Sequence, residues 1–240
     1  MEKTRYAHLA PSEQSRGADP PPVAWAFPED AARVDLPPAV ELDLPPLDFR
    51  ALVTDRRSVR RYAATPLSLD ELSFLLWCTQ GVKQAGSTHT LRTVPSAGAR
   101  HALETLLLIN RAEDVTPGLY GYEALPHCLV RLGDADGLDA RLAEACCGQD
   151  MVANSAVSFF WVAVPYRCSW RYSDRAYRYL HLDAGHVCQN LYLASEAIGC
   201  GACAVAAFHD DQLIEVLELN PEEAFVIYVA TVGKRPAVSA

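Results

Sequence analysis

A run of arginines around one serine is the part of this sequence with the clearest chemical potential. Arg56, Arg57, Arg60 and Arg61 surround Ser58, so that four guanidinium groups and one hydroxyl lie within six residues. A guanidinium group is a planar set of N–H donors that matches phosphate oxygens, and a serine hydroxyl can donate to a further oxygen. The segment therefore fits an anion-binding site, while a solvated basic turn is the alternative.

The overall charge gives this cluster its context. The chain has 240 residues and a formal net charge of -9, so a local concentration of positive charge stands out, and a bound anion would relieve its repulsion. The same acidity is unfavourable for general binding to nucleic acids or anionic membranes, and we expect neither partner. We also find no apolar run of the roughly 20 residues that a membrane span needs and no apolar signal segment, so we expect a cytoplasmic protein.

Other common catalytic and metal-binding motifs are missing from the sequence. It has no G-x-x-x-x-G-K-[ST] or G-x-G-x-x-G phosphate loop, no G-x-S-x-G elbow and no H-E-x-x-H pair. Among the eight cysteines, Cys200 and Cys203 have C-x-x-C spacing, but a zinc site would need a second pair of ligands with similar spacing. We therefore expect no metal, and we interpret the cysteines as reduced, mostly buried thiols.

The chain divides into a proline-rich arm and a globular region. Residues 1–47 contain Pro-rich stretches without periodicity, which predicts an extended arm lying against an apolar surface. A short helix is expected over 48–55. Ser68 and Glu71 form an S-x-x-E capping box that predicts a helix ending near Gly81, followed by a polar loop over 82–94.

Strands and helices alternate in the remainder of the chain. Apolar and β-branched runs predict strands over 103–109, 157–164 and 225–232 and a hairpin of 118–122 with 127–132. Helices are expected over 138–147, 182–198 and 210–217, with Gly199 ending the second one and a turn of small residues over 201–207. This order predicts an α+β layered fold.

Several segments, in the same order, carry a resemblance to a known family. Arg56-Arg-Ser-Val-Arg60 resembles the R-x-S-x-[RK] signature of nitroreductase-like flavoproteins, and Pro95-Ser-Ala-Gly98 is similar to the P-S-A-G segment of their SagB-type or ThcOx-like dehydrogenase branch. Arg175-Ala-Tyr-Arg-Tyr179, then Leu182-Asp-Ala-Gly-His186 and Gln189-Asn-Leu-Tyr192, resemble the most diagnostic part of that branch. Ala204 to Phe208 with Asp210-Asp211, and Val232-Gly-Lys234, complete a resemblance over about residues 5–234.

The resemblance implies an FMN site with particular residues. Arg56, Arg57, Ser58 and Arg60 would hold the phosphate and ribityl side, helped by Lys234 or Arg235. Pro95, Ser96, Ala97 and Gly98 would approach the flavin from the other subunit. Val205, Ala206 and Ala207 would lie beside the ring, where a backbone N–H aimed at N5 stabilises negative charge on the reduced flavin.

The resemblance also implies a fold and an assembly. It is that of a nitroreductase-like α+β protein with a mixed, mainly antiparallel sheet flanked by helices, forming an intertwined homodimer whose flavin sites are shared across the two-fold axis. The expected divisions are the arm (1–47), an FMN-binding domain (48–236) and a tail (237–240). The arm and the tail are expected to wrap the other subunit.

One departure from the branch concerns the candidate catalytic pair. Azoline-oxidising members carry Lys-Tyr where this chain has Arg171 and Tyr172. Arginine stays charged and is a poor base, so Tyr172 would take the proton, with its pKa lowered by the cationic neighbour. Residues of a surface loop are the alternative for both. We interpret His186 as a structural histidine hydrogen-bonded in the core.

Three functions are compatible with these patterns. One is dehydrogenation of azoline rings to azoles on a modified peptide. A second is reduction of nitro or quinone compounds with NAD(P)H as the donor. The third is a flavin-binding subunit without its own turnover, held in a larger peptide-modifying complex.

Overall fold

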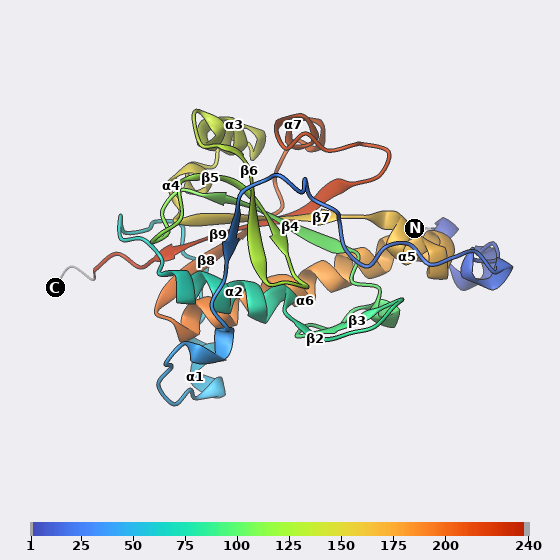
Figure 1. The fold of residues 1–240 in the computed structure, drawn as a ribbon, viewed down its shortest axis with the longest axis horizontal. Coiled ribbons are helices and arrows are strands. Elements are labelled where there is room, and N and C mark those ends of the chain that lie inside the picture. The colour runs from blue at the N-terminus through green and yellow to red at the C-terminus, as the bar shows by residue number, and fades with distance from the viewer. Residues whose placement is uncertain (1, 238–240) are drawn as a thin grey trace.

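The computed structural model describes residues 2–237, so of the expected tail it includes only Ala237. The described residues form a seven-stranded antiparallel sheet of order β1-β6-β5-β4-β7-β9-β8, with helices on both faces (Figure 1). Its strands are β1 (Arg33–Asp35), β4 (Leu103–Ile109), β5 (Gly118–Glu123), β6 (Cys128–Asp134), β7 (Val157–Ala163), β8 (Cys200–Val205) and β9 (Phe225–Lys234). The expected α+β fold with a mainly antiparallel sheet is confirmed.

Two groups of helices cover the two faces of this sheet (Figure 1). The helices α2 and α6 lie on one face, and α3 and α7 lie on the other. The helices are α1 (Phe49–Asp55), α2 (Leu69–Gln80), α3 (Leu138–Ala145), α4 (Met151–Asn154), α5 (Pro165–Tyr172), α6 (Ala176–Ala197) and α7 (Asp210–Val216). None of the helices within residues 2–237 is long and apolar enough to cross a membrane.

The sheet divides the core into two parts, as the interior strand β7 shows. Every residue of β7 is buried, as its continuous apolar sequence predicts. Phe159 and Trp161 face the cluster beneath α2 and α6, whereas Phe160 and Val162 face the cluster beneath α3 and α7. This alternation is the two-residue period of a strand that is covered on both sides.

The start of α2 and the end of α6 lie where the sequence predicts. In α2 the capping box is complete, because Ser68 Oγ accepts the N–H of Glu71 at 3.1 Å and Glu71 accepts the N–H of Ser68 at 2.9 Å. After α6, Gly199 has the positive φ of +67° expected at a helix C-terminus. The start of α6 was predicted wrongly, since the helix begins at Ala176, six residues before the expected Leu182.

Three further expectations differ from the structure. The expected polar loop over 82–94 contains an antiparallel hairpin of β2 (Val82–Ala85) and β3 (Thr90–Arg92). The small residues expected to form a turn from Gly201 belong to strand β8 as far as Val205, because alanine and glycine allow close packing against neighbouring chain segments. His186 is exposed on α6 in the described chain and is not a core residue.

The proline-rich arm packs on its own chain and adds an edge strand. Its residues Arg33–Asp35 pair with β6, a strand that the sequence did not reveal. Phe27 lies directly over Gly121 of β5, where an added Cβ would come within 3.0 Å of its ring. Further along, Trp170 donates its indole N–H to the carbonyl of Ala18 at 3.0 Å. Trp25 and Phe27 of the arm therefore lie against the apolar core of their own chain.

Candidate functional site

The arginine-rich stretch of residues 56–61, called the basic segment below, lies along the outer edge of β8, the last strand of the sheet. Ser58 forms an isolated parallel bridge with Ala202, and the N–H of Val59 donates to the carbonyl of Ala202 at 2.9 Å. This approach requires Gly201, since an added Cβ would lie 2.5 Å from the Cβ of Val59. The segment is thus fixed by the backbone of β8, and its exposed arginines are free to face solvent.

Tyr192 connects this segment to the long helix α6. Its hydroxyl lies 2.9 Å from Ser58 Oγ and accepts the backbone N–H of Ala204 at 2.8 Å. The guanidinium carbon of Arg56 lies 5.2 Å from the centre of the Tyr192 ring, a cation–π contact. Tyr192 is thus a site residue that the sequence did not single out, although it closes one of the family-like motifs.

The other arginines of the segment leave positive charge at the surface. Arg57 and Arg60 are exposed, and Arg56 is half-buried against Tyr192. Burial raises the pKa of the nearby Cys203 thiol, and the charge of Arg60 opposes that rise. A cluster of guanidinium groups at an accessible sheet edge is the chemistry that a phosphate needs.

The two basic residues near the C-terminus are already engaged with carboxylates. Lys234 forms an ion pair with Glu71, and Arg235 forms one with Glu196. Arg235 also donates to the carbonyl of Cys200 at 2.9 Å. Both residues lie beside β8, and their charges are partly neutralised within the chain.

The chain just beyond the C-terminal end of β8 is exposed to solvent. Val205 is buried and pairs with Val229, whereas Ala206 and Ala207 lie beyond the last pairing and are exposed. The Ala207 carbonyl accepts from the Gln149 side chain at 3.0 Å, which fixes the backbone here. From Ala202 to Ala206 an extended chain covers about 13 Å, so an elongated ligand held at Ser58 could follow the strand to these alanines.

The P-S-A-G segment is held by a buried carboxylate of α6. Ser96 Oγ donates to Asp183 at 2.7 Å, and the N–H of Ala97 lies 3.3 Å from both oxygens of the same carboxylate. Ser96 Oγ also accepts the N–H of His101 at 2.9 Å. Burial raises the pKa of Asp183, and the bonds from Ser96 and Ala97 oppose that rise. Asp183 belongs to one of the family-like motifs, but its role in holding this loop was not predicted from the sequence.

Gly98 brings the same loop against the candidate catalytic pair. It has a φ of +58°, and an added Cβ would lie within 3.0 Å of the Tyr172 hydroxyl and 3.1 Å from Arg171 Nε. These two residues end helix α5, with Arg171 exposed and Tyr172 half-buried. The structure therefore brings Pro95–Gly98, Arg171 and Tyr172 together within one chain.

An aromatic and cationic group surrounds Tyr172. Its ring meets that of Tyr179 edge to face with centres 4.9 Å apart, and the Tyr179 hydroxyl lies 2.8 Å from the hydroxyl of Tyr6 in the arm. Arg175 lies over the rings of Tyr6 and Tyr179, at 4.7 and 5.5 Å. The hydrogen bond with Tyr6 and the charge of Arg175 lower the pKa of Tyr179, while burial opposes this effect.

These two halves of the candidate site lie far apart in a single chain. Tyr179 contacts the half formed by Tyr172, whereas Tyr192 contacts the half formed by Ser58. Both belong to the continuous helix α6, and a rise of 1.5 Å per residue separates them by about 20 Å. One chain therefore does not assemble the basic segment and the Arg171–Tyr172 pair into one pocket.

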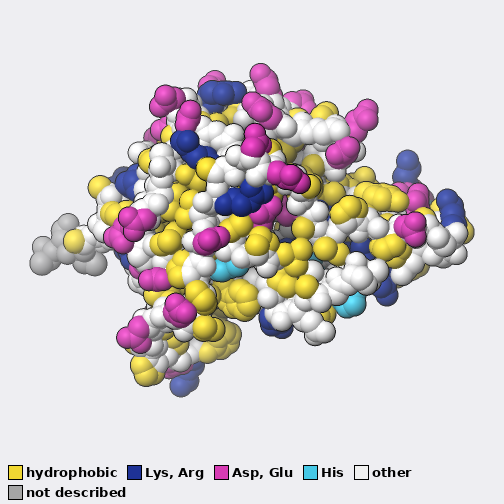
Figure 2. Space-filling view, in the orientation of Figure 1, with side chains coloured by type: hydrophobic (Ala, Val, Ile, Leu, Met, Phe, Trp, Pro, Cys, Tyr) yellow, Lys and Arg dark blue, Asp and Glu magenta, His cyan; other side chains and the backbone are white. Residues whose placement is uncertain are grey.

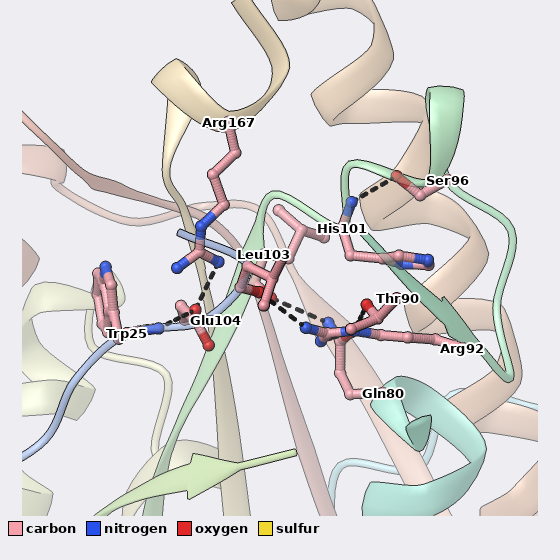
Figure 3. Close-up of polar contacts among 10 residues, drawn as sticks. Trp25, Gln80, Thr90, Arg92, Ser96, His101, Leu103, Glu104 and Arg167 are labelled. Carbon is pink, nitrogen blue, oxygen red and sulfur yellow. Dashed lines mark hydrogen bonds and ion pairs between the residues drawn. The ribbon is translucent and has the colours of Figure 1, made fainter. Parts of the chain in front are cut away.

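A buried ion pair lies beside the strand that follows the P-S-A-G loop (Figure 3). Arg167 and Glu104 are only 3% and 5% exposed, and their charged atoms lie 2.5 Å apart. Glu104 also accepts the backbone N–H of Trp25 at 2.8 Å, which ties the arm to β4. A buried pair of this kind fixes geometry, because loss of either partner leaves an uncompensated charge.

Arg92 and His101 lie next to this pair (Figure 3). Arg92 is buried and donates to Gln80 at 2.9 Å and to Thr90 at 3.2 Å. Burial, followed by the charge of Arg92, lowers the pKa of His101 to about 3. The imidazole is therefore neutral near pH 7.

The cysteines with C-x-x-C spacing do not share a surface. Cys200 belongs to the core on the α2 and α6 side, and Cys203 to the core on the α3 and α7 side. All eight cysteines are free thiols. Within residues 2–237 no group of three or more His, Cys, Asp or Glu side chains could hold a metal ion.

Comparisons with known proteins agree with this geometry. The model of the nitroreductase family matches residues 53–234. The chain is 34% identical over 191 residues to MJ1384 of Methanocaldococcus jannaschii, which is provisionally described as a nitroreductase; the match covers 80% of this chain and 92% of that protein. It is also 27% identical over 156 residues to the trifolitoxin-processing protein TfxB of Rhizobium leguminosarum bv. trifolii, covering 60% of this chain and 41% of TfxB.

A solved structure gives the same result for the fold. The crystal structure of a protein from Anabaena variabilis, provisionally described as a nitroreductase, superposes with a TM-score of 0.71 at 27% identity. The match covers 87% of this chain and 42% of that longer chain. The family match extends from the end of α1 to the end of β9 and includes the basic segment, the P-S-A-G loop and β8. The chain belongs to the nitroreductase family.

Proposed function

We propose that the protein is an FMN-dependent oxidoreductase that acts as a homodimer. The observation that carries the proposal is the placement of the basic segment along the outer edge of β8, which leads from Ser58 to the exposed Ala206 and Ala207. In this arrangement a phosphate binds at Arg56, Arg57, Ser58 and Arg60, and the flavin ring lies beside Val205, Ala206 and Ala207. Lys234 and Arg235 contribute positive charge at the phosphate end.

The residues present fit this cofactor. The donor set at the basic segment is that of a phosphate site, and Gly201 admits the segment against β8. Along β8 the carbonyl of Ala202 and the N–H of Ala204 both face the outer edge, so strand alternation directs the N–H of Ala206 to that edge. When bound, FMN supplies two-electron chemistry, and a donor N–H near its ring stabilises negative charge.

A second copy of the chain would complete the site. The two halves lie about 20 Å apart along α6, so the Pro95–Gly98 loop of a partner supplies what one chain lacks. An exposed apolar face of α1 supports such pairing, because Phe49 is 68% exposed and Val53, one turn further along the same helix, is 48% exposed. Light scattering at micromolar concentration should give the mass of a dimer, and a monomer would contradict the assembly.

For the substrate we propose a modified peptide whose azoline rings are oxidised to azoles. The similarity to TfxB, which is named as a trifolitoxin-processing protein, supports this class. Because arginine is a poor base, we propose that Tyr172 accepts the proton and that Arg171 orients a substrate carbonyl. The guanidinium carbon of Arg171 lies 5.6 Å from the centre of the Tyr172 ring, so the two side chains can act on the same substrate group.

A nitro or quinone reductase that uses NAD(P)H is the second candidate, favoured by the similarity to MJ1384. Such a reductase needs no dedicated base, since water can supply protons. A flavin-binding subunit without turnover, assembled in a larger peptide-modifying complex, is the third. The free thiols fit a reducing compartment, and we propose a cytoplasmic location.

The substrate proposal is tested by comparing wild type with Tyr172→Phe. Purified protein loaded with FMN is mixed with an azoline-containing peptide, and the loss of two hydrogens per ring is followed by mass spectrometry. Conversion by wild type and none by Tyr172→Phe supports peptide oxidation. Rapid NADPH-driven reduction of a nitroaromatic that is unaffected by Tyr172→Phe, with no azole formed, favours the reductase.

A further inference from the structure

Two hollows adjoin each other at the end of the molecule where the arm meets α5 and α6. The first has a volume of about 780 Å³ and is lined by Pro21, Trp25, Pro165 and Phe225 among others. The second has a volume of about 800 Å³. Tyr177, which is 48% exposed, lines both hollows and so forms their common boundary.

The two hollows differ in chemistry. The walls of the first are mostly proline and aromatic or aliphatic side chains, and hydrophobic side chains gather over this part of the surface (Figure 2). The second is lined by three cationic side chains, Lys3, Arg175 and Arg178, against one carboxylate, Asp174. In a chain with a net charge of -9, this concentration of positive charge favours an anionic ligand.

The cationic side chains are held in place by the arm. Arg175 donates to the Thr4 carbonyl at 3.0 Å and stacks on Tyr6, and Arg178 donates to the Thr4 hydroxyl. The acceptors in these contacts are uncharged oxygens of Thr4, and a guanidinium group has five N–H donors, so the contacts orient both arginines. Positioned arginines of this kind match the two oxygens of a carboxylate.

We propose that these adjoining hollows are the docking site for an acidic peptide, with an apolar stretch in the first hollow and carboxylate side chains in the second. The inference rests on the proposed function, because it names the kind of peptide that reaches the candidate catalytic pair. Tyr179 lines the second hollow and also packs against Tyr172, so a peptide held there passes next to that pair.

The arrangement of two adjoining hollows of different chemistry favours an extended chain over a small molecule. A drug-sized ligand fills a pocket of roughly 300–1,000 Å³, and here each hollow alone has that capacity. A ligand that uses both must be elongated and must change from apolar to acidic along its length. A peptide has both properties.

The test uses the full chain and a fluorescein-labelled peptide with a Pro-Leu half and a Glu-rich half, followed by fluorescence anisotropy. A matched peptide has Gln in place of every Glu. We expect the acidic peptide to bind and the Gln peptide to bind at least about tenfold more weakly, with affinity falling as salt is raised. Equal binding of the two peptides would overturn the inference, as would full displacement by citrate at the same carboxylate concentration.

Charge reversals locate the site. Arg178→Glu should weaken binding by about tenfold or more, whereas Arg141→Glu, the same change on the exposed side of α3, should bind like wild type. Because Arg178 also contacts the arm, Lys3→Glu serves as a second variant, and thermal melting reports whether each variant is folded. If Arg141→Glu and Arg178→Glu weaken binding equally, the site is refuted.

The FMN content of the same samples separates this inference from the proposed function. Peptide binding by a protein that takes up no FMN would support the docking site and contradict the proposed oxidoreductase. FMN bound in full, without preference for the acidic peptide, would contradict the docking site alone.

Discussion

The contact between Gly98 and Tyr172 is the point at which the P-S-A-G loop meets the candidate catalytic pair. Replacing Gly98 with alanine should have two separate costs. The residue has a φ of +58°, a conformation that costs a residue with a Cβ roughly 1–2 kcal/mol. The new methyl group would also meet the Tyr172 hydroxyl, and overpacking of this kind costs about 1–3 kcal/mol. We therefore expect Gly98→Ala to lower the free energy of unfolding by about 2–5 kcal/mol.

Matched variants separate the two costs. Gly137 has a φ of +68° and nothing within 4 Å of an added Cβ, so Gly137→Ala should show the backbone cost of roughly 1–2 kcal/mol alone. Tyr172→Phe removes the hydroxyl that the new methyl group meets. In the double variant Gly98→Ala/Tyr172→Phe, the steric part should be recovered, giving a favourable coupling of about 1 kcal/mol or more.

Urea denaturation at a fixed protein concentration measures all four variants. The reasoning is refuted if Gly98→Ala costs no more than Gly137→Ala. It is refuted equally if the double variant is as unstable as the sum of the single ones, because then the loop and Tyr172 are not in contact.

Two further predictions concern the buried network beside the loop. Burial lowers the pKa of His101 to about 3, so the folded state opposes its protonation, whereas the unfolded chain takes up the proton below about pH 6.5. The free energy of unfolding should therefore be unaffected by His101 above about pH 6.5 and should fall as the pH decreases towards 3, by at most about 1.4 kcal/mol per pH unit. His101→Asn should show a flatter loss in urea titrations from pH 7 to 4, and an unchanged slope would contradict this. Glu104→Gln leaves Arg167 buried without its charge partner and should cost about 3–5 kcal/mol. Asp134→Asn, which breaks an exposed pair with Arg131, should cost only about 0–1 kcal/mol, and similar costs for both would show that the buried pair does not matter.

Much of the fold could be predicted because its signals are local. The apolar runs of β4 and β7 are buried on both faces, and the capping box marks the start of α2 without reference to the remainder of the chain. The strand β1 could not be found in this way, because three residues of alternating polarity become a strand only by pairing with β6. The start of α6 was missed because Arg175, at its N-cap, makes no side-chain capping bond.

The candidate site also combines features that are local in the sequence with contacts that are not. The residue types of the basic segment and the P-S-A-G loop point to phosphate binding and to the family. In the structure the basic segment lies against β8, and the P-S-A-G loop lies against α6. The supporting residues are non-local: Tyr192 reaches Ser58 across 134 residues, and Asp183 reaches Ser96 across 87. His186 was misplaced because a helix pattern does not show which neighbouring element covers each face.

The visible absorption spectrum of the purified, desalted protein tests the central proposal most directly. Acid release then identifies the flavin and compares its amount with that of the chain. We predict an oxidised-flavin spectrum, with FMN and chain in equal amounts, and loss of the colour in an Arg56→Ala/Ser58→Ala variant that remains folded. A colourless protein that also takes up no added FMN would contradict the assignment of the basic segment as a phosphate site, and with it the proposed oxidoreductase.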